Sequence, residues 1–289
     1  MGIILSSDTR VIVQGITGTQ ASFHTELMLK YGTNILAGTS PGKGGKTVHG
    51  VLVYDSVEEA QERNNANCSI IFVPGPFVLD AVLEAFDGGI KLVVVISEHV
   101  PIRDTIEFTE RAKAVGATVV GPNTPGVIVP GKAKLGIMPS SVFKPGHVGL
   151  VSRSGTLTYE VAASMTQNGL GQSTCVGLGG DPVVGFGFVD ALKKFGEDAE
   201  TKAVVLIGEI GGNLEELTAD YIEKANYSKP VFAYIAGSCA PVGKRMGHAG
   251  AIILGMAGTA QSKISALSAA GVKVADKPSQ VAKLVASVL

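Results

Sequence analysis

The stretch Arg10-Val-Ile-Val-Gln-Gly-Ile-Thr-Gly-Thr-Gln-Ala21 decides the fold of this chain. A β-branched run ends at Gly15-Ile-Thr-Gly18, and a helical pattern follows in which Phe23, Met28 and Leu29 are predicted to be buried. A strand, a glycine-rich turn and a helix in this order form the first unit of a nucleotide-binding α/β domain, where glycines and the helix N-terminus admit a phosphate. Because the spacing is G-x-x-G-x-x-A rather than the full G-x-G-x-x-G, the motif alone fits a structural turn equally well.

The second predicted strand, residues 34–38, leads into the polar segment Thr39-Ser-Pro-Gly-Lys-Gly-Gly-Lys46. An NAD site would place an acidic residue near the end of this strand to bind the ribose hydroxyls. The sequence has Lys43 and Lys46 there instead. Two cations favour a phosphorylated ribose such as that of coenzyme A, while NADP and a merely solvated lysine loop remain alternatives.

The composition limits the class of protein. The chain has 289 residues, of which 45% are hydrophobic and 17% charged, so we expect two folded domains with large cores. The formal net charge of -1 argues against a nucleic-acid-binding protein. The three cysteines form no C-x-x-C pair, which fits a reducing, cytoplasmic setting and gives no metal site. Neither a secretory signal in residues 1–10 nor an apolar run of membrane-spanning length is present, so no membrane contact is expected.

Strands and helices alternate along the rest of the chain, as in parallel α/β sheets. We predict a first domain over residues 1–126, a crossover linker over 127–147, which is rich in Pro, Gly and Lys, and a second domain over 148–289. Polar residues repeatedly follow the strands, and ligands of open α/β sheets bind at the carboxyl ends of the strands. Further strands are predicted at 68–73, 92–96, 118–120, 148–151, 173–177, 203–207, 231–235 and 272–274.

A second strand-to-helix turn lies at Ser152-Arg-Ser-Gly-Thr156. Its hydroxyl groups and the free N–H groups of the helix start suit an anion, above all a phosphate. The G-x-S-x-G pattern is absent here, so a serine hydrolase is excluded.

The segment Gly243-Lys-Arg-Met-Gly-His-Ala-Gly-Ala-Ile252 carries His248 on a glycine-rich loop. An imidazole can transfer protons or accept a phosphoryl group near neutral pH, although a structural loop histidine fits the same pattern. Glu209 follows the predicted strand 203–207, and the His248 loop follows the predicted strand 231–235. In a parallel sheet both strand ends lie on one side, so Glu209 is expected to accept a hydrogen bond from one ring nitrogen of His248. Lys263 and Lys283 are predicted to lie on solvated faces.

Together these stretches resemble the alpha subunits of succinyl-CoA synthetase, also called succinate–CoA ligase, over nearly the whole chain. The resemblance implies an α/β protein in which an N-terminal Rossmann-like, CoA-binding domain precedes a flavodoxin-like, doubly wound α/β domain. The stretches that carry it are Gly15–Gly18, Pro41–Gly45, Ser152–Glu160, Gly208–Gly212 and Gly243–Ala251.

The resemblance also implies roles for individual residues. His248 matches the histidine that is transiently phosphorylated, and Glu209 matches the carboxylate that orients it. Phosphate contacts are implied for Ser154, Gly155 and Thr156, and a substrate contact for Tyr159. Coenzyme A contacts are implied for Thr17, Gly18, Thr19, Gln20, Lys43, Val73, Ile96 and Glu98.

The implied activity is that of an NDP-forming acid–thiol ligase, which makes succinyl-CoA reversibly from succinate, coenzyme A and ATP or GTP through a phosphohistidine. The resemblance also implies a beta subunit whose ATP-grasp site binds the nucleotide and its Mg²⁺, in an αβ or α2β2 heteromer. This chain itself has neither an ATP-grasp nor a Walker pattern, and no metal site is predicted in it. A malate–CoA ligase or another NDP-forming acyl-CoA synthetase shares these features. A CoA-binding regulatory protein with an inactive site and an NADP oxidoreductase are the alternatives from other classes.

Three positions depart from the family pattern. Thr124 stands where the family usually has Cys, Gly75 where Ala is usual, and His99, expected to be exposed, where Gly is usual. We expect the last two changes to affect the coenzyme A side and none to affect His248 or Glu209.

Overall fold

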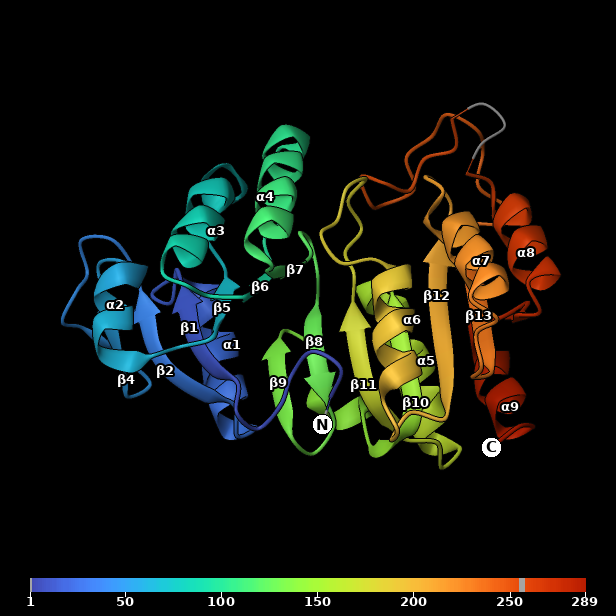
Figure 1. Cartoon of the computed structure of the whole chain (residues 1–289), viewed down its shortest axis with the longest axis horizontal. Coiled ribbons are helices and arrows are strands. Elements are labelled where there is room, and N and C mark those ends of the chain that lie inside the picture. Colours follow the sequence, from blue (N-terminus) through green and yellow to red (C-terminus); the bar gives the residue numbers. More distant parts are fainter. Residues whose placement is uncertain (1, 255–257) are drawn as a thin grey trace.

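The computed structural model describes residues 2–254 and 258–289 and contains two seven-stranded sheets side by side (Figure 1). The first sheet has the order β3-β4-β2-β1-β5-β6-β7, and its strands are parallel except for the β3–β4 pair. Its strands are β1 (Arg10–Gln14), β2 (Asn34–Thr39), β3 (Thr47–Val48), β4 (Val51–Tyr54), β5 (Cys68–Ile71), β6 (Leu92–Val95) and β7 (Thr118–Val120). Its helices are α1 (Thr19–Lys30), α2 (Val57–Asn64), η1 (Gly75–Phe77), α3 (Val78–Asp87) and α4 (Ile102–Val115).

The second sheet has the order β14-β13-β12-β10-β11-β8-β9. Its strands are β8 (Gly126–Val129), β9 (Ala133–Gly136), β10 (Pro145–Ser152), β11 (Gln172–Gly177), β12 (Ala203–Glu209), β13 (Val231–Ala236) and β14 (Lys273–Ala275). Its helices are η2 (Ser140–Val142), α5 (Gly155–Gln167), α6 (Phe188–Glu197), α7 (Leu214–Lys224), α8 (Ala260–Ala269), η3 (Pro278–Gln280) and α9 (Val281–Ala286).

The two strand orders confirm the predicted fold. In the first sheet the winding reverses beside β1, between β2 and β5, as in Rossmann-like domains. In the second, the five parallel strands β10 to β14 have the flavodoxin-like order, and the winding reverses between β10 and β12. The glycine-rich turn Gly15–Gly18 follows β1, at the point where the winding of the first sheet reverses. Arg153, directly after β10, and Glu209, the last residue of β12, lie at the corresponding point of the second sheet. Ligands of such sheets bind at these positions.

The prediction that residues 127–147 form a crossover linker is wrong in its structure. The segment holds nearly all of β8, all of β9 and the start of β10, and β8 pairs with β11 in the second sheet. All four residues of β8 and of β9 are buried. β8 (Gly-Val-Ile-Val) therefore shows no alternation of apolar and polar residues, and Lys134 of β9 is buried although its residue type is typical of an exposed position.

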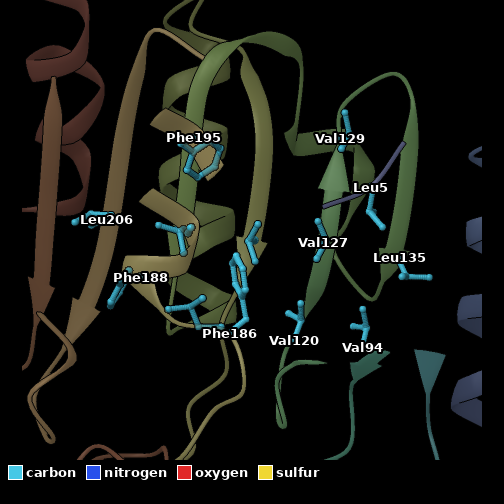
Figure 2. Close-up of a cluster of buried hydrophobic side chains, with 14 of the residues drawn as sticks. Leu5, Val94, Val120, Val127, Val129, Leu135, Phe186, Phe188, Phe195 and Leu206 are labelled. Atoms are coloured by element: carbon cyan, nitrogen blue, oxygen red, sulfur yellow. The ribbon is translucent and has the colours of Figure 1, made fainter. Parts of the chain in front are cut away.

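This hairpin joins the cores of the two sheets (Figure 2). One cluster of buried apolar side chains includes Val94 and Val120 of the first sheet. It also includes Val127 of β8, Leu135 of β9 and Phe186 from the segment before α6, and all five side chains are 0–3% exposed. Apolar packing of this kind fixes the two domains relative to each other. The described residues contain no helix that is long and apolar enough to cross a membrane.

Candidate functional site

A cleft of about 480 Å³ lies between the two domains. The first domain contributes residues from α1 and from the segment after β6, and the second contributes the start of α5 and the loop after β13. The cleft therefore brings together residues predicted to contact coenzyme A and the predicted reactive histidine. Its lining includes Gln20, Ile96, Glu98, Thr156, Tyr159 and His248.

His248 is held by Glu209 at the edge of this cleft. Its Nδ1 lies 3.0 and 2.9 Å from the two carboxylate oxygens of Glu209. The carboxylate is 8% exposed and the imidazole 31% exposed. The hydrogen bond that Nδ1 donates to Glu209 raises the pKa of His248 against the opposing effect of burial. Because Nδ1 faces the carboxylate, Nε2 is the nitrogen left to react.

Parallel strand ends and glycines produce this arrangement. β12 and β13 are parallel neighbours, so Glu209 and the loop that carries His248 leave the sheet at the same edge. Gly180 packs against the imidazole so closely that a Cβ there would lie 2.3 Å from the ring Cγ. The N–H of Gly250 donates to the carbonyl of Gly180 at 2.9 Å, which ties the histidine loop to the loop after β11. A side chain at position 180 would displace the ring.

The start of α5 faces the same cleft. Ser154 caps the helix, its Oγ accepting from the N–H of Leu157 at 3.4 Å. Gly155 and Thr156, in the first turn, line the cleft with His248. The first N–H groups of a helix have no intrahelical acceptor and lie at the positive end of its dipole. The arrangement can therefore hold an anion beside the imidazole.

Tyr159 lies one turn further along α5 and also lines the cleft. Burial raises the pKa of its phenol to about 12. The hydroxyl therefore stays neutral at physiological pH and can donate a hydrogen bond to an acid in the cleft.

The remaining residues predicted to contact coenzyme A lie around the end of β1. The Nζ of Lys43, on an exposed loop, donates to the Oγ1 of Thr17 at 2.9 Å. Gly18 and Thr19 form the start of α1. Val73 lines a second hollow, of about 450 Å³, beside β1 and η1. The predicted residues thus follow the sheet edge from this hollow to the interdomain cleft, as an elongated ligand would require.

Several polar residues of the site were not singled out from the sequence. Asp181 is buried, accepts from the Nδ2 of Asn123 at 2.9 Å and helps to raise the pKa of His248. Arg153 is buried, with its Nη2 3.6 Å from the Oε1 of Glu209. Asp181 follows Gly179-Gly180 after β11. A polar residue just after a strand end was the sequence signal that could have identified it as part of the site.

The prediction that Lys263 is solvated is wrong, because this side chain is 0% exposed and paired with Glu215. Lys283 and His99 are exposed, as predicted.

The three departures from the family pattern have structural consequences. The Oγ1 of Thr124, buried in the cleft wall, donates to the carbonyl of Gly177 at 2.6 Å and accepts from the N–H of Gly126 at 2.9 Å. Gly75 and His99 lie against each other, since a Cβ at position 75 would come within 2.4 Å of the carbonyl oxygen of His99. His99 has a φ of 60°, in the left-handed region that favours glycine. The two changes on the coenzyme A side are therefore coupled through the backbone.

Over residues 2–254 and 258–289, no cluster of three or more His, Cys, Asp or Glu side chains is placed to hold a metal ion.

Comparison with known proteins gives two family matches. Residues 6–99 match the CoA binding domain, and residues 151–273 match the CoA-ligase domain. The first match covers the glycine-rich turn, Lys43 and Glu98, and the second covers Arg153 to Lys263, including Glu209 and His248.

Two relatives match over almost their full length. The chain is 59% identical over 289 residues to the ADP-forming succinate–CoA ligase subunit alpha 2 of Archaeoglobus fulgidus, with 100% of both chains covered. It is 60% identical over 279 residues to the ADP-forming succinate–CoA ligase subunit alpha of Methanothermobacter thermautotrophicus, covering 96% of this chain and 94% of that one.

Solved structures share the fold. ATP citrate lyase from Methanothrix soehngenii, in complex with citrate and coenzyme A, matches with a TM-score of 0.91 and 25% identity over 99% of this chain. This chain spans 50% of that enzyme. The dinucleotide-forming acetyl-coenzyme A synthetase 1 of Ca. Korarchaeum cryptofilum, at 21% identity and a TM-score of 0.74, shares the fold over 95% of this chain.

Proposed function

Because this chain belongs to the succinate–CoA ligase alpha-subunit family, we propose that it is the alpha subunit of an ADP-forming succinate–CoA ligase. In this function it forms succinyl-CoA from succinate, coenzyme A and ATP, reversibly. The relatives are named ADP-forming, which favours ATP over GTP. The reaction is that of an acid–thiol ligase.

The observation that carries this proposal is the pairing of His248 with Glu209 beside the start of α5, in one cleft with residues of the first domain. A carboxylate that accepts from Nδ1 fixes the tautomer in which Nε2 has a free lone pair. Nε2 can then attack the terminal phosphorus of ATP, and ADP leaves. The N–H groups of Gly155 and Thr156 stabilise the charge of the transferred phosphoryl group.

The phosphoryl group then passes from nitrogen to a carboxylate oxygen of succinate, which breaks the P–N bond and gives an acyl phosphate. The sulfur of coenzyme A attacks the acyl carbon, and inorganic phosphate leaves. Three easier transfers replace one difficult condensation, which is the benefit of covalent intermediates. Tyr159, with its neutral hydroxyl in the cleft, contacts the acid.

Coenzyme A binds along the first domain in this proposal. The glycine-rich turn with Thr17, Gly18, Thr19 and Gln20 approaches its phosphates, and the cation of Lys43 binds the 3′-phosphate. Val73 contacts the nucleotide part, while Ile96 and Glu98 line the path of the thiol arm to His248.

An alpha subunit works with a beta subunit. We assign the nucleotide and its Mg²⁺ to an ATP-grasp site on that partner, in an αβ or α2β2 heteromer. A malate–CoA ligase would share the phosphohistidine and differ in the acid pocket. Co-purification with the partner and an assay of succinate, malate and other dicarboxylates, each with ATP and GTP, distinguishes these activities.

The direct test is transfer of label from γ-labelled ATP to the chain in complex with its partner. His248→Asn should abolish labelling while binding of coenzyme A is unchanged. His147→Asn is the matched control, because His147 is exposed and lies at the amino end of β10, the end away from the cleft. Intact labelling of His248→Asn would show that His248 is not the phosphorylated residue.

A further inference from the structure

A chain of buried charges leads from α8 to the carboxylate that holds His248. Lys263, fully buried on α8, donates to the Oε2 of Glu215 on α7. It also donates to the carbonyl of Gly212 at 3.1 Å and to the Oε2 of the half-buried Glu216 at 3.2 Å. A lysine in this setting is unusual, because an ammonium group is rarely taken fully out of water without such partners.

Glu215 connects Lys263 to the carboxyl ends of β10 and β12. Its Oε1 lies 3.3 Å from the Nη1 of Arg153 and accepts from the backbone N–H of Glu209 at 3.1 Å. Arg153 and Glu215 are both 2% exposed. The Nη1 of Arg153 also donates to the carbonyls of Glu209, at 3.3 Å, and of Gly211, at 3.0 Å. Arg153 is thus anchored to the backbone that carries Glu209.

The last contact of the chain joins Arg153 to the pair formed by Glu209 and His248. The Nη2 of Arg153 lies 3.6 Å from the Oε1 of Glu209, and both oxygens of Glu209 face the Nδ1 of His248. We propose that Arg153, Glu215 and Lys263 form a positioning relay that fixes the Glu209 carboxylate against the Nδ1 of His248, so that phosphorylation of Nε2 depends on an ammonium group on α8. The inference rests on the proposed function for its activity readout.

Stability alone is a weak reason for such an arrangement. Buried ion pairs are often no more stabilising than apolar side chains of similar volume, because desolvation offsets the attraction. In the relay two cations, Arg153 and Lys263, face two buried carboxylates, Glu209 and Glu215, and Lys263 also contacts the half-buried Glu216. This arrangement leaves Arg153 shared between Glu215 and Glu209, and the carboxylate of Glu209 available to the imidazole.

The relay predicts how His248 responds to its loss. The charged groups that face the imidazole are Glu209 on β12, Arg153 after β10 and Asp181 after β11. Without Glu215, Arg153 pairs more fully with Glu209, and Glu209 becomes a weaker acceptor for the N–H of the imidazole. The pKa of His248 should then fall, since that hydrogen bond is what raises it.

The decisive variant is the double substitution Glu215→Gln with Lys263→Met, which removes both buried charges of that pair together and leaves Arg153 with Glu209 as its partner. The half-buried Glu216 keeps its hydrogen bond from the hydroxyl of Ser262, at 3.0 Å. Label transfer from γ-labelled ATP is measured on the complex with the partner, and the titration of His248 by NMR on the full chain. We expect labelling to slow by about 10- to 100-fold, the range found when the outer partners of a metal-bound histidine and its carboxylate are lost. We also expect a lower pKa of His248 and unchanged binding of coenzyme A.

The control is Lys224→Met, which removes an exposed ion pair with Asp220 from the same helix as Glu215 and should change neither readout. A folded double variant with wild-type labelling overturns the relay. So does slow labelling with an unshifted His248 titration, which is the result of a merely structural role. If the double variant does not fold, Glu215→Gln alone is judged by the same two criteria. An unlabelled wild-type complex would contradict the proposed function instead, and the titrations would still decide on the relay.

Discussion

At the scale of single residues, the chemistry depends on what surrounds one imidazole. Glu209 accepts a hydrogen bond from Nδ1, Gly180 leaves room for the ring, and the start of α5 lines the same cleft as the imidazole. His248 is one of five histidines in the chain, so its residue type alone does not select it. The buried carboxylate behind it does, because a hydrogen-bonded carboxylate fixes the tautomer and raises the basicity of the ring.

The raised pKa of His248 has a consequence for stability. The folded chain binds this proton more tightly than the unfolded chain, whose histidine titrates near 6.5. The contribution of His248 to the free energy of unfolding is therefore fully present below about pH 6.5. It is lost as the pH rises through the higher pKa that His248 has in the folded chain. We expect the difference in thermal midpoint between wild type and His248→Asn to shrink from about pH 6 to about pH 9. His99→Asn, which removes an imidazole that is 88% exposed, is the control. A difference that stays constant across this range would contradict the prediction.

At the scale of elements, the site consists of strand ends and the helix starts that follow them. β1 and β10 each lead through a glycine- or serine-rich turn into a helix, and β12 places Glu209 beside the second turn. Such turns leave backbone N–H groups and short side chains facing a ligand. The loop after β2 adds the cation of Lys43, which contacts Thr17 in the first turn.

Lys43 provides a test of the ligand of the first domain. If its ammonium group binds the 3′-phosphate of coenzyme A, Lys43→Met should weaken binding of coenzyme A by about 10-fold or more, the worth of a charge-assisted hydrogen bond. Binding of dephospho-coenzyme A, which lacks that phosphate, should change little. Calorimetric titration of both ligands measures the contrast. Lys46→Met, three residues along the same loop, is the matched control, and an equal loss for both ligands would rule out a phosphate contact.

At the scale of the whole molecule, the hairpin β8–β9 packs against the first sheet and so holds together the two domains that form the cleft. Its buried face belongs to the cluster that includes Val94 and Val120 of the first sheet (Figure 2). The carboxyl ends of the parallel strands in both sheets point to the same side of the molecule (Figure 1). Rigid packing of this kind keeps the coenzyme A residues and His248 at a fixed separation.

Leu135 of β9 tests this role of the hairpin. The side chain is 1% exposed in the shared cluster, so Leu135→Ala should lower the free energy of unfolding by about 2 to 5 kcal/mol. Urea denaturation followed by circular dichroism measures the change. Leu217→Ala, at a side chain that is 50% exposed, should stay within about 0.5 kcal/mol of wild type. Equal midpoints for Leu135→Ala and wild type would show that the hairpin is not part of the core.

Patterns that are local in the chain were predictable. The strand, turn and helix of residues 10–30 follow from β-branched residues, glycines and helical spacing within one short window. Even there, packing decided the details, since Phe23 was predicted to be buried and is 54% exposed. The contact of Glu209 with His248 was also predictable, although 39 residues separate them, because the ends of parallel strands meet at one edge.

The sequence by itself determined two α/β domains, the glycine-rich turns and the pairing of one histidine with one carboxylate. Only the tertiary structure decided that residues 127–147 extend the second sheet and that Lys263 is buried against Glu215, 48 residues earlier. The physical reason is the range of the interactions. Local propensity and strand-end geometry are written in neighbouring residues, whereas the burial of a charge depends on which distant groups fold against it.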